Sequence, residues 1–130
     1  MGLTEDERMS LVEYRMKKAK ETFAEISVLT ENRLWCTAAN RLYYACFYAA
    51  SALLINDGYQ ANSHNGVRSV LAARYADENR IEKSLIKTYG QLFNMRQRVD
   101  YEDWVIVEEE DIIPLIEPSE KFIARMEQLL

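Results

Sequence analysis

The chain has 130 residues, of which 48% are hydrophobic and 28% charged, with a formal net charge of −5. This length suits a single domain with its own core, and the mixed charges and 11% aromatic residues exclude a disordered chain. The acidic balance argues against a protein whose whole surface binds nucleic acid, because neutralising phosphates requires clustered Lys and Arg, but it leaves a local basic patch open.

The first predicted helix runs from about Glu5 to Leu29. Thr4 and Glu7 have the spacing of a capping box, which marks the start of a helix. Apolar residues follow at alternating intervals of four and three, typical of a surface helix with one buried stripe: Val12, Met16, Ala19, Phe23 and Ile26. A link as short as residues 30–33 makes the next helix antiparallel to the first.

The second predicted helix follows this link and ends at Asp57, and from Thr37 onward it is apolar on nearly every side. A helix of this kind is buried on several sides, so we expect it to be the axis of the domain. Gly58 is expected to end it as a left-handed cap residue. Asn40 and Arg41 interrupt the apolar surface. A buried arginine either forms an ion pair within the protein or takes part in binding or catalysis.

The third predicted helix begins with Asn62 or Ser63 as its cap and continues to about Ala76. Its inner face carries His64, Val67, Leu71 and Tyr75. His64 is the only histidine, and its place in the first turn favours a packed, hydrogen-bonded side chain near a helix end.

The fourth predicted helix runs from about Asn79 to Tyr101, and Arg96 falls in the register that its pattern reserves for the core. A fifth helix closes the chain, with Asp111 as its cap and a kink or restart at Pro118. These elements predict one all-α domain over residues 1–130, an up-and-down bundle of four long helices plus a C-terminal helix.

Metal-ligand, phosphate-loop and nucleophile-elbow patterns do not occur in the sequence, so we expect neither a metal nor another cofactor. Cys36 and Cys46 are interpreted as small core residues that stay reduced in the cytoplasm. The polar, acidic start of the chain does not resemble a signal peptide, and no apolar run is long enough for a membrane span. We therefore expect a cytoplasmic protein without contact to a membrane.

Seven polar residues form the candidate site, and they come from two helices. The second helix contributes Asn40, Arg41 and Tyr44, and the fourth contributes Arg96, Arg98, Asp100 and Tyr101. One interpretation is a structural network that holds the two helices together. The other is a cleft in which guanidinium groups hold a phosphate and a tyrosine stacks or donates a hydrogen bond. The spacing does not decide between them.

Three stretches, NRLYYACFYAASALL, SHNGV and NMRQRVDYED, resemble the HEPN domain family, close to its small stand-alone prokaryotic members. The resemblance implies an all-α bundle that dimerises, with the ends of the two fourth helices facing a shared cleft. It also implies binding or cleavage of RNA. Many members of this family are encoded beside a minimal nucleotidyltransferase as toxin–antitoxin pairs, so such an enzyme is an expected partner.

The ribonuclease motif of the family is an arginine, four residues and a histidine. Arg96 matches the arginine, but Tyr101 occupies the histidine position. Tyrosine, with a pKa near ~10, does not transfer protons near neutral pH as histidine does. Arg96 and Tyr101 are therefore the candidate catalytic residues, and tyrosine at the histidine position argues against an enzyme.

The leading hypothesis is a homodimeric binding module whose Arg/Tyr cleft binds RNA, a nucleotide or a partner nucleotidyltransferase. Two alternatives stay open. One is a divergent metal-independent endoribonuclease, and the other is a structural interaction bundle without a ligand.

Overall fold

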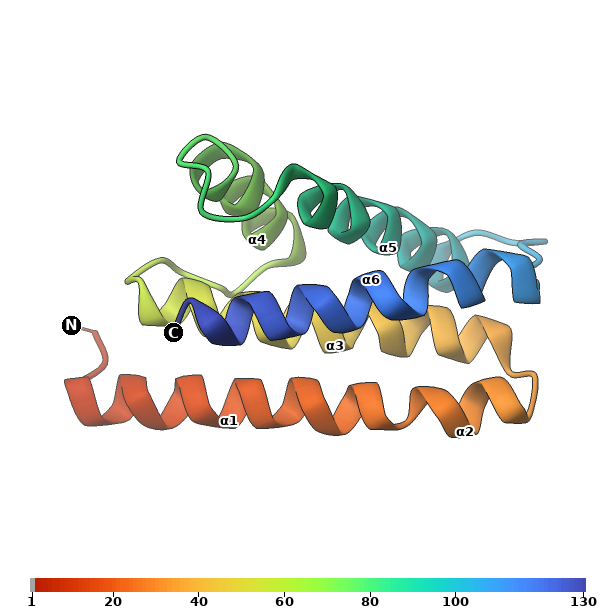
Figure 1. The fold of residues 1–130 in the computed structure, drawn as a ribbon, viewed down its shortest axis with the longest axis horizontal. Helices are drawn as coiled ribbons and strands as arrows, with labels where there is room; N and C mark the ends of the chain where they lie inside the picture. The colour runs from red at the N-terminus through yellow and green to blue at the C-terminus, as the bar shows by residue number, and fades with distance from the viewer. Residues whose placement is uncertain (1) are drawn as a thin grey trace.

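A computed structural model describes residues 2–130, which form helices and loops without a strand. The elements are α1 (Glu5–Ala24), α2 (Ile26–Glu31), α3 (Trp35–Asn56), α4 (His64–Val70), the π-helix η1 (Leu71–Tyr75), α5 (Lys83–Tyr101) and α6 (Glu109–Gln128). The prediction of an all-α bundle is confirmed (Figure 1).

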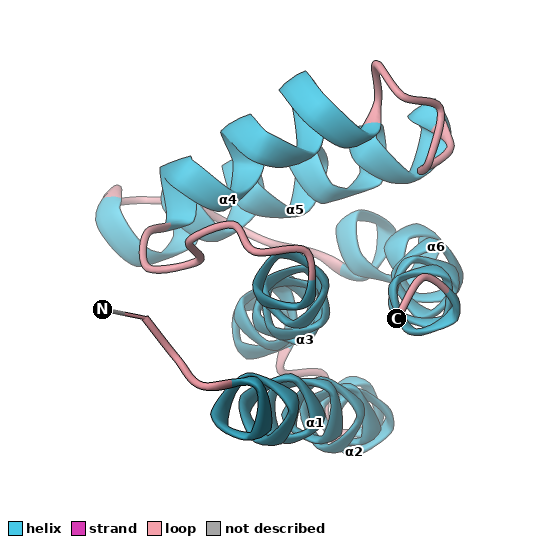
Figure 2. Ribbon diagram, turned by 90° about the vertical axis from the view of Figure 1, so that its left-hand side faces the viewer, coloured by secondary structure: helices cyan, strands magenta, loops and turns pink. Residues whose placement is uncertain are grey.

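Helix α3 lies at the centre of the bundle, with α1 and α2 on one side and α5 and α6 on others (Figure 2). Its many small side chains let neighbouring helices approach closely, and those fully or almost fully buried are Ala38, Ala39, Ala45, Ala49, Ala50 and Ala52. Larger residues on the same helix, such as Leu42 and Leu53, are equally buried. The predicted axis of the domain is therefore confirmed.

The start of α1 has the predicted capping box. The Thr4 N–H donates to Glu7 Oε1 at 2.9 Å, and the Glu7 N–H donates to Thr4 Oγ1 at 3.1 Å. The helix is shorter than predicted, because it ends at Ala24 and resumes as α2. The Glu25 N–H bonds to the Thr22 carbonyl three residues back, which tightens the turn and interrupts the α-helical pattern.

The connection from α3 to α4 follows the prediction closely. Gly58 has a φ of 88°, as expected of a left-handed cap residue. Ser63 is the N-cap of α4, and its Oγ accepts a hydrogen bond from the Gly66 N–H at 3.0 Å. A Cβ atom at Gly66 would lie only 2.6 Å from that oxygen, so glycine leaves room for the cap.

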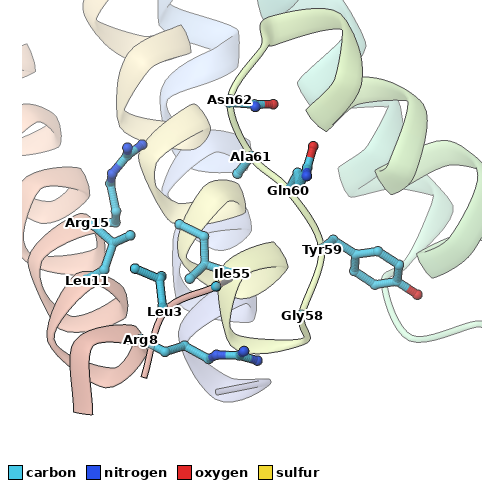
Figure 3. Close-up of a pocket in the computed structure, with 11 residues that line it drawn as sticks. Leu3, Arg8, Leu11, Arg15, Ile55, Gly58, Tyr59, Gln60, Ala61 and Asn62 are labelled. Carbon is cyan, nitrogen blue, oxygen red and sulfur yellow. The ribbon is translucent and has the colours of Figure 1, made fainter. Parts of the chain in front are cut away.

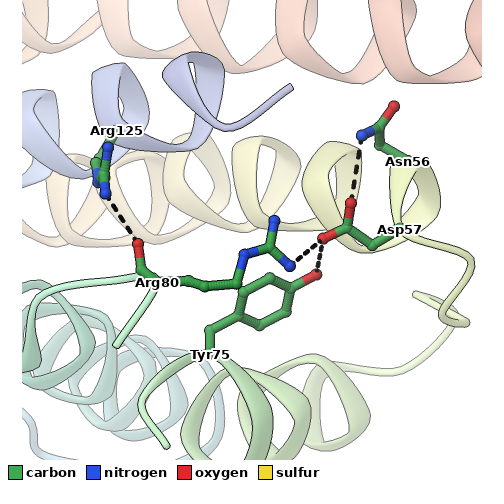
Figure 4. A network of polar contacts seen from close by, with 5 residues as sticks. All are labelled: Asn56, Asp57, Tyr75, Arg80 and Arg125. Carbon is green, nitrogen blue, oxygen red and sulfur yellow. Dashed lines mark hydrogen bonds and ion pairs between the residues drawn. The ribbon is translucent and has the colours of Figure 1, made fainter. Parts of the chain in front are cut away.

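An ionic network ties the end of α3 to the segment after it (Figure 4). Asp57 Oδ2 accepts hydrogen bonds from Tyr75 Oη at 2.6 Å and from Arg80 Nη1 at 3.0 Å. The Arg80 carbonyl in turn accepts one from Arg125 Nη2 on α6 at 3.0 Å. The network fixes the π-helix and the following loop against both α3 and α6.

Two predicted helix starts are wrong. Helix α5 begins at Lys83, because the left-handed backbone of Asn79, with a φ of 54°, stops the chain from becoming helical there. Helix α6 is capped by Glu108, whose N–H donates to Asp111 Oδ2 at 2.9 Å, so Asp111 lies inside the first turn. Pro118 does not restart this helix, which continues to Gln128.

The two cysteines differ in environment, and the prediction of a core position is wrong for one of them. Cys36 lies in the first turn of α3, where the helix has just left the loop, and is exposed. Cys46 lies in the core, its thiol donates to the Ser119 carbonyl at 3.8 Å, and burial raises its pKa to about 12. Both are free thiols.

Candidate functional site

The centre of the candidate site is Arg96, a charged side chain that is only 2% exposed. Its guanidinium carbon lies 4.7 Å from the ring centre of Tyr43 and 5.7 Å from that of Phe93. Asp100 is its charged partner, but the contact of 3.8 Å is too long for a hydrogen bond. Arg96 Nε has no hydrogen-bond partner among residues 2–130. The site thus holds a buried cation whose Nε–H donor is unused, which suits an anionic group.

Two further residues of the predicted set lie near this cation, one bound to Asp100 and one beside the guanidinium. Asn40 Nδ2 on α3 lies 3.3 Å from both carboxylate oxygens of Asp100 and so joins α3 to α5. The ring centre of Tyr101 lies 5.7 Å from the Arg96 guanidinium carbon, and this tyrosine is 75% exposed. Tyr101 therefore covers the cation on its solvent side.

The other predicted residues are less closely connected. Arg41 lies over the ring of Tyr44 at 5.4 Å, and its buried Nε has no hydrogen-bond partner in the described part of the chain. Arg98 is exposed and takes part in none of the contacts around Arg96. The structure therefore brings Asn40, Asp100 and Tyr101 together at Arg96.

Sequence reasoning did not place Tyr43 or His64 in the site. Tyr43 is fully buried, and its Oη lies 2.8 Å from His64 Nδ1, a hydrogen-bond distance. This confirms the prediction that His64 is packed and hydrogen-bonded. Its pKa is lowered by partial burial and then by the positive charge of Arg96, although Asp100 opposes the shift. The only signal in the sequence was a single histidine, and its spacing cannot show that α4 packs beside Tyr43.

The loop after α5 exposes apolar side chains close in sequence to Tyr101. Trp104 is 97% exposed, and Ile106 is also largely in solvent. The backbone of Trp104 is left-handed, with a φ of 63°, which is uncommon for a bulky residue. This segment adds exposed apolar side chains directly after Tyr101 of the candidate site.

A separate hollow of about 380 Å³ lies between the start of α1 and the loop from α3 to α4 (Figure 3). Leu11 and Ile55 lie between the side chains of Arg8 and Arg15, and the ring of Tyr59 points away. Arg15 Nη1 donates to Ser51 Oγ at 3.3 Å, so this arginine already has a partner in the fold.

Replacing Arg96 with methionine separates the structural from the functional interpretation. We expect Arg96→Met to leave the free energy of unfolding within about 1 kcal/mol of the wild type, or to raise it, because an apolar residue avoids burying a poorly paired charge. Urea denaturation followed by circular dichroism measures the change. The neighbouring core variant Leu92→Ala should cost about 2–5 kcal/mol. A loss of 3 kcal/mol or more in Arg96→Met would instead identify Arg96 as a structural lock.

Fold and site together define a class, an all-α bundle whose central and fifth helices enclose a weakly paired arginine. Residues 12–129 match the HEPN domain family, and the chain belongs to that family. Among residues 2–130, no helix combines the length and the apolar character needed to cross a bilayer.

Relatives with similar sequences cover most of the chain. A protein named UPF0332 protein from Thermotoga maritima is 32% identical over 125 residues, which cover 96% of this chain and 95% of the relative. Two proteins of Methanocaldococcus jannaschii carry the name "Putative toxin". One is 30% identical over 86% of this chain and 83% of its own length, and the other is 24% identical over 95% and 89%.

Proposed function

We propose that this protein is the toxin-like member of a two-component toxin–antitoxin system, and that it acts by binding RNA at the Arg96 site. Membership of the HEPN family and two relatives named as toxins support the toxin-like role. The other component would be a nucleotidyltransferase, and the working form would be a cytoplasmic homodimer.

One observation supports the choice of RNA, namely the buried guanidinium of Arg96, whose Nε–H has no partner among residues 2–130 and whose contact with Asp100 is long. A phosphate group offers oxygens that satisfy these donors better than Asp100 does at 3.8 Å. Tyr101 rotates away from its solvent side to admit the phosphate. The ring of Tyr101, or the exposed Trp104, then stacks on a base of single-stranded RNA.

The acidic balance of the chain fits a site of this kind. A net charge of −5 does not favour an extended phosphate-binding surface. A single buried arginine contacts few phosphates, so the affinity depends less on salt than that of a basic groove does. Recognition then rests on one charged contact and on stacking.

Fluorescence anisotropy with labelled single-stranded RNA tests the proposal. We expect Arg96→Met to weaken binding roughly 10- to 100-fold, the loss that removal of a charged hydrogen bond produces. The charge-matched control Arg74→Met changes an exposed arginine on η1 and should bind like the wild type.

Two results would contradict the proposal. The first is equal RNA affinity of the wild type and Arg96→Met. The second is a wild-type protein that binds no RNA but binds a free nucleotide or the partner protein at the same residues, which would support the other ligands of this site.

A further inference from the structure

The hollow between the start of α1 and the loop from α3 to α4 carries positive charge that no neighbouring carboxylate balances. Two arginines line it, Arg8 and Arg15, and none of its lining residues is acidic. Neither arginine forms an ion pair among residues 2–130, although the chain has a net charge of −5. Ser51 accepts a hydrogen bond from Arg15, but a neutral hydroxyl does not balance the charge. The hollow therefore suits a group with negative charge.

The space between these two arginines is apolar. Arg8 and Arg15 lie about 10 Å apart along the axis of α1, and Figure 3 shows Leu3, Leu11 and Ile55 between their side chains. The volume of about 380 Å³ falls within the range of roughly 300–1,000 Å³ in which small groups bind, so a large side chain has room there. The hollow thus suits an occupant that presents an apolar side chain together with carboxylates.

The segment of residues 102–107, which follows α5, has this composition. Glu102 and Asp103 precede Trp104, and Trp104 and Ile106 are 97% and 77% exposed. Neither carboxylate forms an ion pair in the described part of the chain. Both lie at the C-terminal end of α5, where the helix dipole disfavours negative charge. These charges lower the stability of the single chain and stay available for a partner.

The conformation of Trp104 also has no benefit within one chain. Its left-handed backbone, with a φ of 63°, costs about 1–3 kcal/mol in a residue other than glycine. Its indole stays in water and contributes nothing to the core. When such a side chain is buried at an interface, it is often one of the residues that contribute most to binding. The strained, exposed tryptophan thus indicates a contact with another molecule.

The hollow and the 102–107 segment cannot meet within one chain, because they lie at opposite ends of the bundle (Figure 1). Asn40, which contacts Asp100 near the end of α5, is about 22 Å from Ile55 along the axis of α3. The loop after α5 extends from there away from the hollow. Complementary charge and apolar character on two distant surfaces of one molecule point to a contact between copies.

We propose that the hollow binds the 102–107 segment of a second copy of this chain. Trp104 of one copy enters between Leu11 and Ile55 of the next, and the two carboxylates before it pair with the two arginines. Each copy gives its segment to one neighbour and receives the segment of another. A contact of this kind is heterologous, so copies add one after another, unlike the symmetric homodimer of the proposed function.

Sedimentation velocity over a concentration series from micromolar to millimolar tests the growth of such chains. We expect the average mass of the wild type to rise past that of two copies, and to fall again when added salt screens the ion pairs. Trp104→Ser should require at least about 30-fold higher concentration for the same rise, because it removes the central apolar contact. Tyr14→Ser, which changes an exposed aromatic residue on α1, should behave like the wild type.

A mixing experiment tests whether the two surfaces meet each other. The first protein carries Trp35→Phe, Arg8→Gln and Arg15→Gln, so Trp104 is its only tryptophan and its hollow lacks charge. The second carries Trp35→Phe and Trp104→Ser, so it has an intact hollow and no tryptophan. Adding the second to the first should shift the emission to shorter wavelength as the indole leaves water.

Two versions of the second protein serve as comparisons. With Arg8→Gln and Arg15→Gln added it should bind at least about tenfold more weakly, because the carboxylates lose their partners. With Arg74→Gln added, which changes an exposed arginine on η1, it should bind unchanged. Circular dichroism checks that each variant is folded.

Three results would overturn the inference. The first is an average mass that stays constant over the concentration series, and the second is an emission that does not shift on mixing. The third is an equal shift with and without the two arginines, which would mean that Trp104 is buried against a different surface. None of them bears on RNA binding at Arg96, which is measured in dilute protein.

Discussion

Raising the pH above about 10 should unfold this protein steeply, by roughly 4 kcal/mol per pH unit once titration is complete. Tyr43, Tyr75 and Tyr89 are almost completely buried, and burial raises the pKa of each phenol. In the unfolded chain tyrosine loses its proton near pH ~10. Above that pH these three tyrosines give the unfolded state up to three fewer protons than the folded state, and each full proton contributes about 1.4 kcal/mol per pH unit. The stability that these phenols provide is thus complete below pH 10 and falls as the pH rises. The buried Cys46 thiol, whose pKa is raised to about 12, adds a smaller loss that begins near its ordinary pKa of ~8.5.

Two phenylalanine variants identify the tyrosines responsible. The Tyr89 hydroxyl is buried without a hydrogen-bond partner among residues 2–130, so Tyr89→Phe should keep its stability at pH 7 and lose roughly one third of the slope. Tyr75→Phe should lose the same part of the slope but cost about 1.5–3 kcal/mol at pH 7, because its hydroxyl donates to the Asp57 carboxylate. Urea denaturation at several values between pH 8 and 11 measures both. An unchanged slope in both variants would show that other groups cause the alkaline unfolding.

Removing the Asp57 carboxylate should have the largest effect of any single polar substitution at neutral pH. We expect Asp57→Ala to lower the free energy of unfolding by about 3 kcal/mol, because it leaves the buried Tyr75 hydroxyl without an acceptor and Arg80 without its ion pair. The Arg80 side chain is partly exposed and can turn to water, which places the cost at the lower end of the range for buried pairs. Thermal and urea denaturation at pH 7 measure the loss.

A second variant separates charge from hydrogen bonding in this network. Asp57→Asn retains a carbonyl oxygen that can accept from Tyr75, so its loss of stability should be clearly smaller than that of Asp57→Ala. Equal stability of Asp57→Ala and the wild type would mean that packing alone fixes the π-helix. Hydrogen exchange at residues 71–75 reports whether this segment loosens first.

Periodicity predicted the helices well where a buried stripe or a cap chemistry was present. The Thr4 and Glu7 capping box and Gly58 as a left-handed cap are local features, and the structure has both. The errors lie where contacts between residues far apart in the sequence determine the bounds of a helix. The sequence near Asn79 does not reveal that Ile81 is buried from a loop. Nor does it reveal that Pro118 is tolerated within α6, where the neighbouring Phe122 and Ile123 dock on the core.

The candidate site was predictable in part, for the same reason. Arg96 at a core register and Asp100 one turn later are visible as a pattern on one helix. The pairing of Asn40 with Asp100 joins residues 60 positions apart, and the sequence predicted only that the polar residues of the two helices belong to one site. His64 shows no periodicity that connects it to Arg96. Its contact with Tyr43 depends on how α4 packs against α3, which is a property of the folded chain.

The exposed position of Trp104 lets its fluorescence report what binds next to the candidate site. Its indole is almost entirely in water, three residues after the tyrosine that covers Arg96. The second tryptophan, Trp35, is half-buried at the start of α3. In a Trp35→Phe background, all tryptophan emission comes from that loop. A base stacked on the indole quenches the emission, whereas burial against a protein shifts it to shorter wavelength. One titration, without any label, thus tells a nucleic-acid ligand from a protein partner.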